Sequence, residues 1–155
     1  MTRPGTTVKG ESGRQYKLGE QVNEGGQGVI HLAMDTSTGR AGIVKMFRPE
    51  WCRQDIRERT KYLVAVGDGL HRECGVLCPP MDVIEHPRDC LGHFSSVAPG
   101  ETWEKFLAIA DFTFLQGVQA CAAVARAVEV LEHRGIAHGD LQAGNLMIQR
   151  DGTVL

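Results

Sequence analysis

The chain lacks the features that mark several specialised classes of protein. Its 155 residues include 17 Lys and Arg against 19 Asp and Glu, for a formal net charge of -2. No excess of positive charge is therefore available to bind a nucleic-acid backbone. Residues 1–15 lack the apolar core of a secretory signal, and we expect no apolar run long enough to cross a bilayer. These absences predict a cytoplasmic protein that binds neither nucleic acid nor membrane.

The cysteines do not form an even set from which a disulfide framework would be built. Five cysteines in a chain without an export signal favour free thiols. A zinc site is an alternative, because His71, Cys74, Cys78, His86, Cys90 and His93 cluster at spacings that suit ligands. However, several of them lie on expected strands, where successive side chains point to opposite faces. We therefore expect core cysteines and surface histidines instead.

The remaining composition is typical of one soluble globular domain, with 42% hydrophobic and 23% charged residues and no repeats. Residues 1–15 are polar and rich in Gly and Thr, which predicts a flexible tail. Apolar and β-branched runs then predict five strands, with a short amphipathic helix over residues 50–67 between the third and the fourth, closed by Gly67. The strands are expected at residues 16–23, 28–35, 40–47, 81–86 and 91–98.

The character of the sequence changes at residues 99–100, where Pro and Gly mark a hinge-like break. A short helix is expected to open near residue 102. Apolar residues then recur at helical spacing over 114–134, and the glycine that follows predicts the end of this helix. A loop, a strand at 145–149 and an incomplete hairpin come last. The expected organisation is a tail at 1–15, a first lobe at 16–98, and a hinge with part of a second lobe at 99–155.

A glycine-rich turn is expected between the first two strands, in the sequence NEGGQGVI from Asn23 to Ile30. Its glycines are Gly25, Gly26 and Gly28, and they let backbone amides approach an anion without obstruction by side chains. Such a turn can cover phosphates. The alternative is a glycine-rich hairpin without a ligand.

Two charged residues follow this turn along the chain. Lys45 lies inside the apolar strand GIVKMF, where an ammonium group either reaches solvent or meets an anion such as a phosphate. Glu58 lies on the helix after this strand, and its carboxylate could hold the Lys45 side chain toward a nucleotide. A solvated helix face explains Glu58 almost equally well.

The sequence HGDLQAGN, residues 138–145, contains the residue types of a phosphoryl-transfer loop. Asp140 can accept a proton from an attacking hydroxyl group, and Asn145 offers an amide oxygen to Mg2+ on nucleotide phosphates. We expect His138, which follows apolar Ala137, to be a packed structural residue and not the base.

The order of these parts resembles the protein kinase family over residues 16–155: a glycine-rich loop, a strand lysine, a helix glutamate, a hinge, a long helix, and a loop like HRDLKPEN. The resemblance implies an α+β fold, with a five-stranded antiparallel β lobe that carries one helix. The first helices and the catalytic loop of an α-helical lobe would follow, with ATP between the lobes. It implies that Asp140 is the catalytic base, assisted by Lys45 and Glu58. It also implies a nucleotide site and an Mg2+ ligand, Asn145; the nucleotide site would consist of Asn23, Gly25, Gly26, Gly28, Ile30, Lys45 and Asn145.

Four differences from the family pattern bear on activity. Asn23 replaces the first loop glycine, a mild change because Asn tolerates a left-handed backbone. Gly139 replaces an arginine that pairs with a phosphorylated segment in many kinases, and Gln142 replaces a lysine that steadies the transferring phosphoryl group. The Asp of the family's DFG segment would follow just beyond Leu155. We therefore expect the front portion of a kinase domain, with inefficient catalysis by this chain alone.

The function implied by the resemblance is ATP-dependent phosphoryl transfer to a Ser or Thr hydroxyl of a protein substrate. One alternative is a pseudokinase-like module that binds a nucleotide or a regulatory partner without catalysis. Another is a small-molecule phosphotransferase, because HGDLQAGN also resembles the loop of antibiotic kinases. We further expect self-association or docking onto another chain, through the apolar face of the helix at 114–131 and the strand edge at 153–155.

Overall fold

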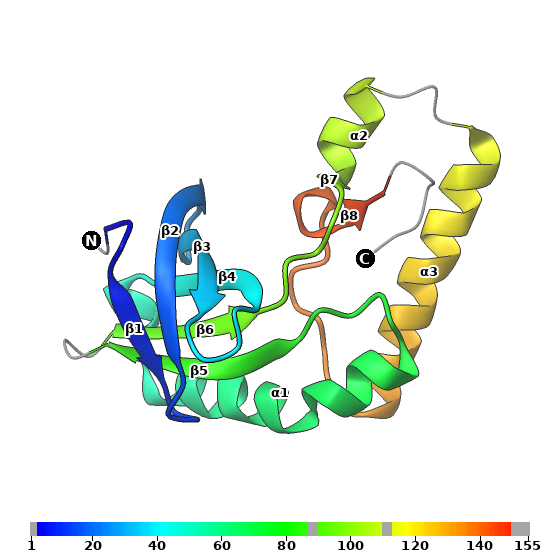
Figure 1. Cartoon of the computed structure of the whole chain (residues 1–155). Helices are drawn as coiled ribbons and strands as arrows, with labels where there is room; N and C mark the ends of the chain where they lie inside the picture. The colour runs from blue at the N-terminus through cyan, green and yellow to red at the C-terminus, as the bar shows by residue number, and fades with distance from the viewer. Residues whose placement is uncertain (1–2, 87–89, 110–112, 150–155) are drawn as a thin grey trace. The chain divides into compact units, whose positions relative to one another are not determined.

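The computed structural model describes residues 3–86, 90–109 and 113–149, without the side chains of His86, Cys90 and Ile109. The chain, drawn in Figure 1, divides into two units. The first unit comprises residues 1–68 and 79–97, and the second comprises residues 69–78 and 98–155. The division at 97 lies next to the predicted boundary at 98. Residues 69–78, by contrast, group with the second unit.

The first unit is built on a closed barrel of six antiparallel strands in the order β1-β2-β3-β4-β6-β5. The prediction of five strands is therefore wrong in number. The four strands of the first half are β1 (Thr7–Gly10), β2 (Gln15–Glu24), β3 (Gly28–Asp35) and β4 (Ala41–Phe47). The other two are β5 (Pro80–His86) and β6 (Cys90–Ser95), and β6 ends three residues earlier than predicted.

The additional strand, β1, comes from the segment that the sequence predicted to be a flexible tail. It pairs with β2 on one side, where Val8 lies opposite Tyr16, and with β5 on the other side, where Gly10 lies opposite Ile84. Its four residues contain one apolar side chain larger than glycine, Val8, which is buried. Because β1 is stabilised by pairing on both sides, with adjacent β2 and with distant β5, its own sequence carries little strand signal.

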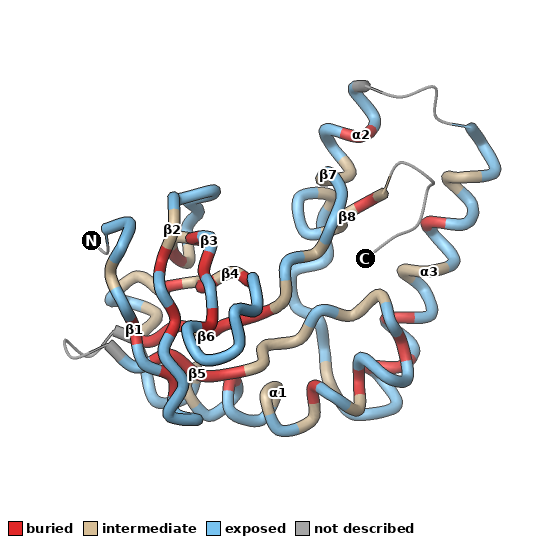
Figure 2. Tube along the Cα trace, in the orientation of Figure 1, coloured by how far each residue is buried: buried red, intermediate tan, exposed pale blue. Residues whose placement is uncertain are grey.

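The core of the first unit lies inside the barrel, where Figure 2 shows the buried positions along the strands. Its members are Val8, Tyr16, Leu18, Ala33, Val44, Met46, Ile84 and Phe94. The rings of Tyr16 and Phe94 stack with centroids 4.3 Å apart. The Tyr16 hydroxyl donates a hydrogen bond of 2.8 Å to buried Asp82, and Ser12 Oγ donates to the same carboxylate. Burial, followed by this carboxylate, raises the pKa of Tyr16 above its usual range.

Helix α1 (Gln54–Glu73) follows β4 after a short 3-10 turn, η1 (Pro49–Trp51). The prediction that this helix ends at Gly67 is wrong. A Cβ atom on Gly67 would lie 3.1 Å from Pro79 Cγ. This glycine is thus explained by close packing, because any larger residue would press on the loop before β5. The helix continues past it, with Leu70 fully buried.

The described part of the second unit contains the end of α1, the helices α2 and α3, and a two-stranded sheet. Strands β7 (Glu101–Thr102) and β8 (Met147–Ile148) pair antiparallel, and α2 (Trp103–Ile109) follows β7 directly. Helix α3 (Phe114–His133) begins at a capping box, in which Thr113 Oγ1 accepts from the Gln116 N–H and the Gln116 side chain accepts from the Thr113 N–H. It ends before Gly135, whose φ of 66° is left-handed. The helix predicted over residues 114–134 is confirmed.

Helix α3 is also long and apolar enough to cross a membrane, with a mean hydropathy of 1.3 over its best window, of which 17% is buried. The sequence predicted no apolar run long enough to cross a bilayer, and among the described residues α3 is an exception by length and composition. Length and composition of this kind also occur in core helices of soluble proteins. Residues 87–89 of the turn predicted at 87–90 and the final hairpin at 150–155 lie outside the described residues, and Cys90 begins β6.

Candidate functional site

The glycine-rich turn joins β2 to β3, and the Gly25 N–H donates a 2.9 Å hydrogen bond to the Gly28 carbonyl oxygen. A Cβ atom on Gly28 would overlap the Met46 carbonyl oxygen, so neighbouring β4 leaves no room for a side chain there. A Cβ atom on Gly25 or Gly26 would meet nothing within 4 Å, and neither residue has a positive φ. Packing within the protein therefore does not explain these two glycines. The open space around them suits close approach of a ligand to the backbone.

Asn23 and Ile30 lie opposite each other on β2 and β3. The Asn23 Oδ1 atom accepts a 2.8 Å hydrogen bond from the Glu24 N–H. Because Asn23 lies within a strand, the left-handed backbone that Asn tolerates is not used. Ile30 is half-buried and is also the register partner of Lys45 on β4. The strand register thus places the end of the turn motif next to the lysine.

The Lys45 ammonium group is held by the turn itself. Its Nζ atom donates a 2.7 Å hydrogen bond to Gln27 Oε1 and lies 5.5 Å from the centroid of the Phe47 ring. Both Lys45 and Gln27 are half-buried. The sequence predicted a phosphate or solvent for this ammonium, and it did not predict the contact with Gln27. In the glycine-rich motif the position of Gln27 is a loop position to which no role is assigned.

Glu58 lies on α1 but does not contact Lys45. Its side chain is exposed, and its Oε1 atom accepts a 3.0 Å hydrogen bond from Gln54 Nε2. The preceding residue, Arg57, pairs at 3.1 Å with Glu11 in the β1–β2 turn. The predicted Lys45–Glu58 contact is thus absent from this structure, although both residues are described. The contact between α1 and the turn that joins β1 to β2 could not be predicted from the sequence of the helix alone.

His93 is the neighbour of Lys45 on the other side, because the two residues are register partners on β6 and β4. Its ring packs edge-on against Phe47 at 5.7 Å, and within the described residues nothing hydrogen bonds to its buried Nδ1 atom. Burial, followed by the charge of Lys45, lowers the pKa of His93 to about 4. His93 is therefore neutral at physiological pH and adds no positive charge beside Lys45.

In the loop after α3, two amide side chains contact one carboxylate. Gln142 Nε2 donates to Asp140 Oδ1 at 3.0 Å, and Asn145 Nδ2 donates to Asp140 Oδ2 at 3.0 Å. Asn145 Nδ2 also donates to the Asp140 carbonyl oxygen at 2.8 Å, which closes the loop over residues 140–145. The structure thus brings together the predicted base and the predicted Mg2+ ligand. Gln142, noted in the sequence only as a lost positive charge, holds the Asp140 carboxylate in place.

Two further residues of this loop bear on the sequence predictions: His138 differs from its prediction, and the backbone explains Gly139. His138 is exposed, and its Nδ1 atom lies 3.4 Å from the Asp140 N–H. The prediction that His138 is a packed residue is therefore wrong, because the described part of the second unit places no cover over it. Gly139 has a φ of 75°. An arginine would be strained in this left-handed conformation, which gives a structural reason for the glycine.

The oxygen atoms of this loop suit a magnesium ion that is coordinated jointly by the protein and by phosphates, and not one coordinated by protein ligands alone. Since Asn145 Nδ2 faces Asp140, and no hydrogen bond among the described residues uses Asn145 Oδ1, that oxygen is available to a metal. No three His, Cys, Asp or Glu side chains converge on a metal position within the described ranges. Mg2+ commonly binds through one or two protein oxygens together with substrate phosphates, which this donor set matches.

Within the described ranges no three such side chains form a zinc site either, and the side chains of His86 and Cys90, two members of the predicted cluster, lie outside the description. Among the described cysteines, Cys52, Cys74, Cys78 and Cys121 are free thiols. Cys74 is buried as expected, whereas Cys78 is exposed at the rim of a cavity of about 170 Å³ in the second unit, which His138 and Asn145 also line. Burial raises the pKa of the Cys78 thiol, which favours the protonated form. This cavity is smaller than the pockets that hold drug-sized ligands.

Comparisons with known proteins place these features in context. No family model matches the chain. The chain is 26% identical over 156 residues to the probable serine/threonine-protein kinase PknB of Bifidobacterium longum, and 26% identical over 156 residues to the serine/threonine-protein kinase PksC of Streptomyces coelicolor. Each likeness covers 92% of this chain, but only 22% and 27% of the respective relatives. The chain therefore spans about a quarter of the length of these curated relatives.

Solved structures show the same fold. Vaccinia related kinase 3 matches with a TM-score of 0.78 and 17% identity, over 97% of this chain and 48% of that one. The PknI kinase domain of Mycobacterium tuberculosis matches with a TM-score of 0.77 and 17% identity, over 96% of this chain and 59% of that one. The α+β fold predicted from the sequence is confirmed as kinase-like. Together, the sequence and fold likenesses identify a protein kinase-like domain.

Proposed function

We propose that the chain binds ATP with Mg2+ and contributes to transfer of the terminal phosphoryl group to a Ser or Thr hydroxyl of a protein. The observation that carries the proposal is the Asp140 carboxylate, which is fixed by amides of Gln142 and Asn145 in an exposed loop. A carboxylate held in this way can accept the proton of an attacking alcohol. The printed names of the two curated relatives support the choice of a Ser/Thr acceptor.

The nucleotide would be bound by backbone and charge together. Amide groups of the open turn at Gly25 and Gly26 and the ammonium of Lys45 suit phosphate oxygens, and Asn145 Oδ1 suits Mg2+. The metal would neutralise charge on the phosphates when bound. In this proposal Lys45 orients the phosphates, Asp140 takes the hydroxyl proton, and Asn23 and Ile30 support the turn. Glu58 would assist Lys45 only after its 3.0 Å hydrogen bond with Gln54 is broken.

The test is transfer of radiolabelled phosphate from ATP to a general Ser/Thr acceptor protein, with Mg2+ present. The chain should label the acceptor, and Asp140→Asn should reduce the rate about 100-fold or more, since positioned general bases contribute that much. Gln15→Asn, a conservative change at an exposed position of β2, should leave the rate unchanged. Equal transfer by wild type and Asp140→Asn would contradict the assigned role.

A second candidate is a pseudokinase-like module that binds a nucleotide or partner without catalysis. The neutral Gln142 favours it, because the amide leaves no positive charge beside Asp140 where negative charge develops in the transition state. Binding of Mg2+ and ATP without any transfer would support this candidate. Labelling of a small-molecule alcohol instead of protein would favour the small-molecule phosphotransferase.

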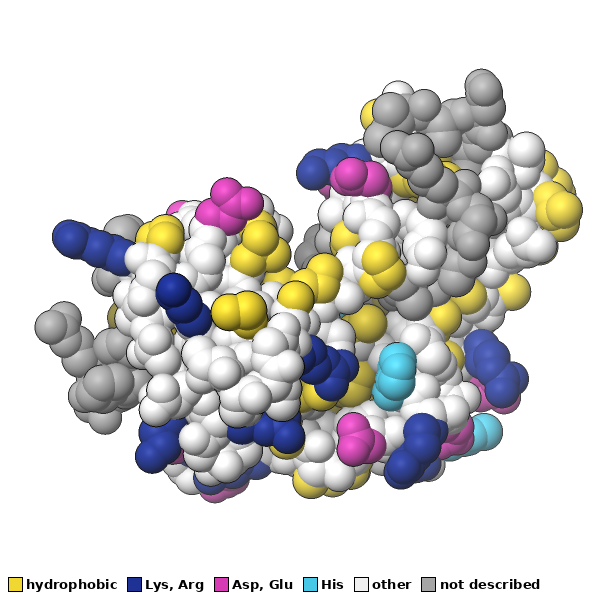
Figure 3. All heavy atoms as spheres, viewed as in Figure 1, with side chains coloured by type: hydrophobic (Ala, Val, Ile, Leu, Met, Phe, Trp, Pro, Cys, Tyr) yellow, Lys and Arg dark blue, Asp and Glu magenta, His cyan; other side chains and the backbone are white. Residues whose placement is uncertain are grey.

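We also propose a cytoplasmic location and association with a second copy of the chain or another protein through α3. The exposed side chains of α3 include Phe114, Leu115, Val118 and Val128, and Figure 3 shows hydrophobic side chains at the surface of this unit. Phe114 is 88% exposed and Leu115 is 64% exposed. Large exposed apolar patches often mark a contact site, and these exposed side chains are candidates for one. The other predicted edge, at 153–155, lies outside the described residues.

A further inference from the structure

The ammonium group of Lys45 is bound by a side chain to which neither the sequence motif nor the proposed function assigns a task. Gln27 is the last residue of the glycine-rich turn before β3, and its Oε1 atom accepts the 2.7 Å hydrogen bond from Lys45 Nζ. The contact is partly buried. A neutral amide oxygen thus lies at the place on the ammonium that a phosphate oxygen would take.

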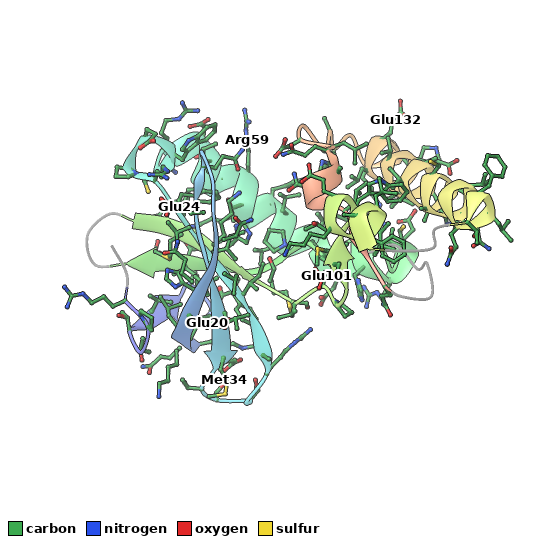
Figure 4. All side chains as sticks on the ribbon, turned by 90° about the horizontal axis from the view of Figure 1, so that it is seen from above. Glu20, Glu24, Met34, Arg59, Glu101 and Glu132 are labelled. Carbon is green, nitrogen blue, oxygen red and sulfur yellow. The ribbon has the colours of Figure 1, made fainter. Side chains whose placement is uncertain are left out.

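The position of Gln27 is fixed by the rest of the turn. The Arg48 N–H donates to the Gln27 carbonyl oxygen at 2.9 Å, and Arg48 Nε donates to the Gly25 carbonyl oxygen at 3.1 Å. The Arg48 guanidinium also pairs with Glu24 at 2.7 Å, and Figure 4 labels Glu24 beside the turn. Backbone and side-chain contacts with the end of β4 therefore hold the turn where Gln27 reaches Lys45.

We propose that Gln27 is an internal competitor for Lys45: its amide oxygen occupies the ammonium in the nucleotide-free protein, and a phosphate oxygen of an oligophosphate ligand displaces it. This inference rests on the proposed nucleotide site, and it names Gln27 as a residue that determines the affinity of that site for phosphates. Displacement is favourable because a phosphate oxygen carries negative charge, so its contact with the ammonium adds a Coulomb attraction that the neutral amide oxygen of Gln27 lacks. The ligand nevertheless loses the contribution of the Lys45–Gln27 contact, so Gln27 weakens nucleotide binding.

The test compares Gln27→Met, which keeps the length of the side chain but removes the strong acceptor, with Gln27→Glu, which places a carboxylate on the ammonium. Calorimetric titration with Mg·ATP and with inorganic tripolyphosphate gives the Kd of each. Gln27→Met should lower both Kd values about three- to tenfold, since a net hydrogen bond to a charged group contributes about that much. Gln27→Glu should raise both about tenfold or more. Gln15→Met, on exposed β2, is the matched control and should change neither.

A ligand-free measurement tests the contact directly. Removing an acceptor from the ammonium makes Lys45 easier to deprotonate, so acylation of Lys45, followed by mass spectrometry, should be at least about twofold faster in Gln27→Met than in wild type or Gln15→Met. Circular dichroism should show the same fold for all variants.

The outcomes separate this inference from the proposed function. If wild type binds and Gln27→Met binds equally or more weakly, the competitor role is overturned while the nucleotide site stands. If wild type does not bind but Gln27→Met does, the competitor role is supported in its strongest form. If neither variant binds ATP or tripolyphosphate, both proposals are overturned.

Discussion

At the scale of single residues, neutral amides hold the charged groups of the candidate site. Gln27 accepts from Lys45, and Gln142 and Asn145 donate to Asp140. An amide can satisfy either an ammonium or a carboxylate because it carries both an acceptor and donors. These amide contacts therefore orient the Lys45 ammonium and the Asp140 carboxylate within the described residues.

His93 gives this scale a prediction about pH. Its folded-state pKa of about 4 lies below the ordinary value of 6.5, so the unfolded chain binds more protons between these two pH values. The stability that neutral His93 contributes is fully present above pH 6.5 and is lost as pH falls toward 4. The loss should amount to about 1–3 kcal/mol.

Urea denaturation at several pH values measures this effect. Carboxylates also titrate in the acid range, so the informative quantity is the difference in unfolding free energy between wild type and His93→Gln. This difference should move against wild type as pH falls from 7 to 4.5. A difference that stays constant with pH would show that His93 is not held neutral by its surroundings.

Among single residues, the sequence identified Asp140 and Asn145 as neighbours because their spacing closes a short loop. It could not identify the partners of Lys45 or Glu58. Lys45 is held by Gln27, which lies 18 residues earlier in the chain, and Glu58 by Gln54 on its own helix. The residue types alone do not decide between such a partner and solvent. The exposed position of His138 was missed for the same reason, since apolar neighbours in sequence do not guarantee cover in space.

At the scale of elements, periodicity predicted α3 well, and local pairing rules predicted most strands of the barrel. Helix α3 has a regular apolar spacing, a capping box at its start and a glycine after its end, so all of its signals are local. Strand β1 and the last turn and a half of α1 lack such signals. The two-sided pairing of β1 and the packing of Gly67 against Pro79 are tertiary effects, which override local propensity.

The exposed apolar surface of α3 leads to a prediction at the same scale. Analytical ultracentrifugation should show concentration-dependent association of the wild-type chain. Replacing Phe114 and Leu115 together by Ser should weaken it about tenfold or more, because burying each side chain contributes about 1.5–3 kcal/mol.

The control for this experiment is Val22→Ser on β2, which removes a side chain that is 49% exposed in the first unit. That variant should associate like wild type. A wild-type chain that stays monomeric at high concentration, or a double variant that associates as strongly, would rule out α3 as the contact surface.

At the scale of the whole molecule, the chain combines a six-stranded barrel unit with a helical unit, and both carry parts of one kinase-like pattern. The fold class was predictable because the order of motifs along the chain survives at 26% identity to the curated relatives. The arrangement of charged side chains within each unit was not, since it depends on a few side-chain contacts that substitutions alter freely.

The central claim is that Lys45 binds the phosphates of a nucleotide. Its most direct test is calorimetric titration of the chain with Mg·ATP, in wild type, Lys45→Met and Lys17→Met, the last removing an exposed lysine of β2. The account predicts binding by wild type and Lys17→Met, and a Kd about tenfold or more higher for Lys45→Met, which loses a charge-assisted hydrogen bond. Equal affinity of all three proteins, or no binding by wild type and by Gln27→Met alike, would contradict it.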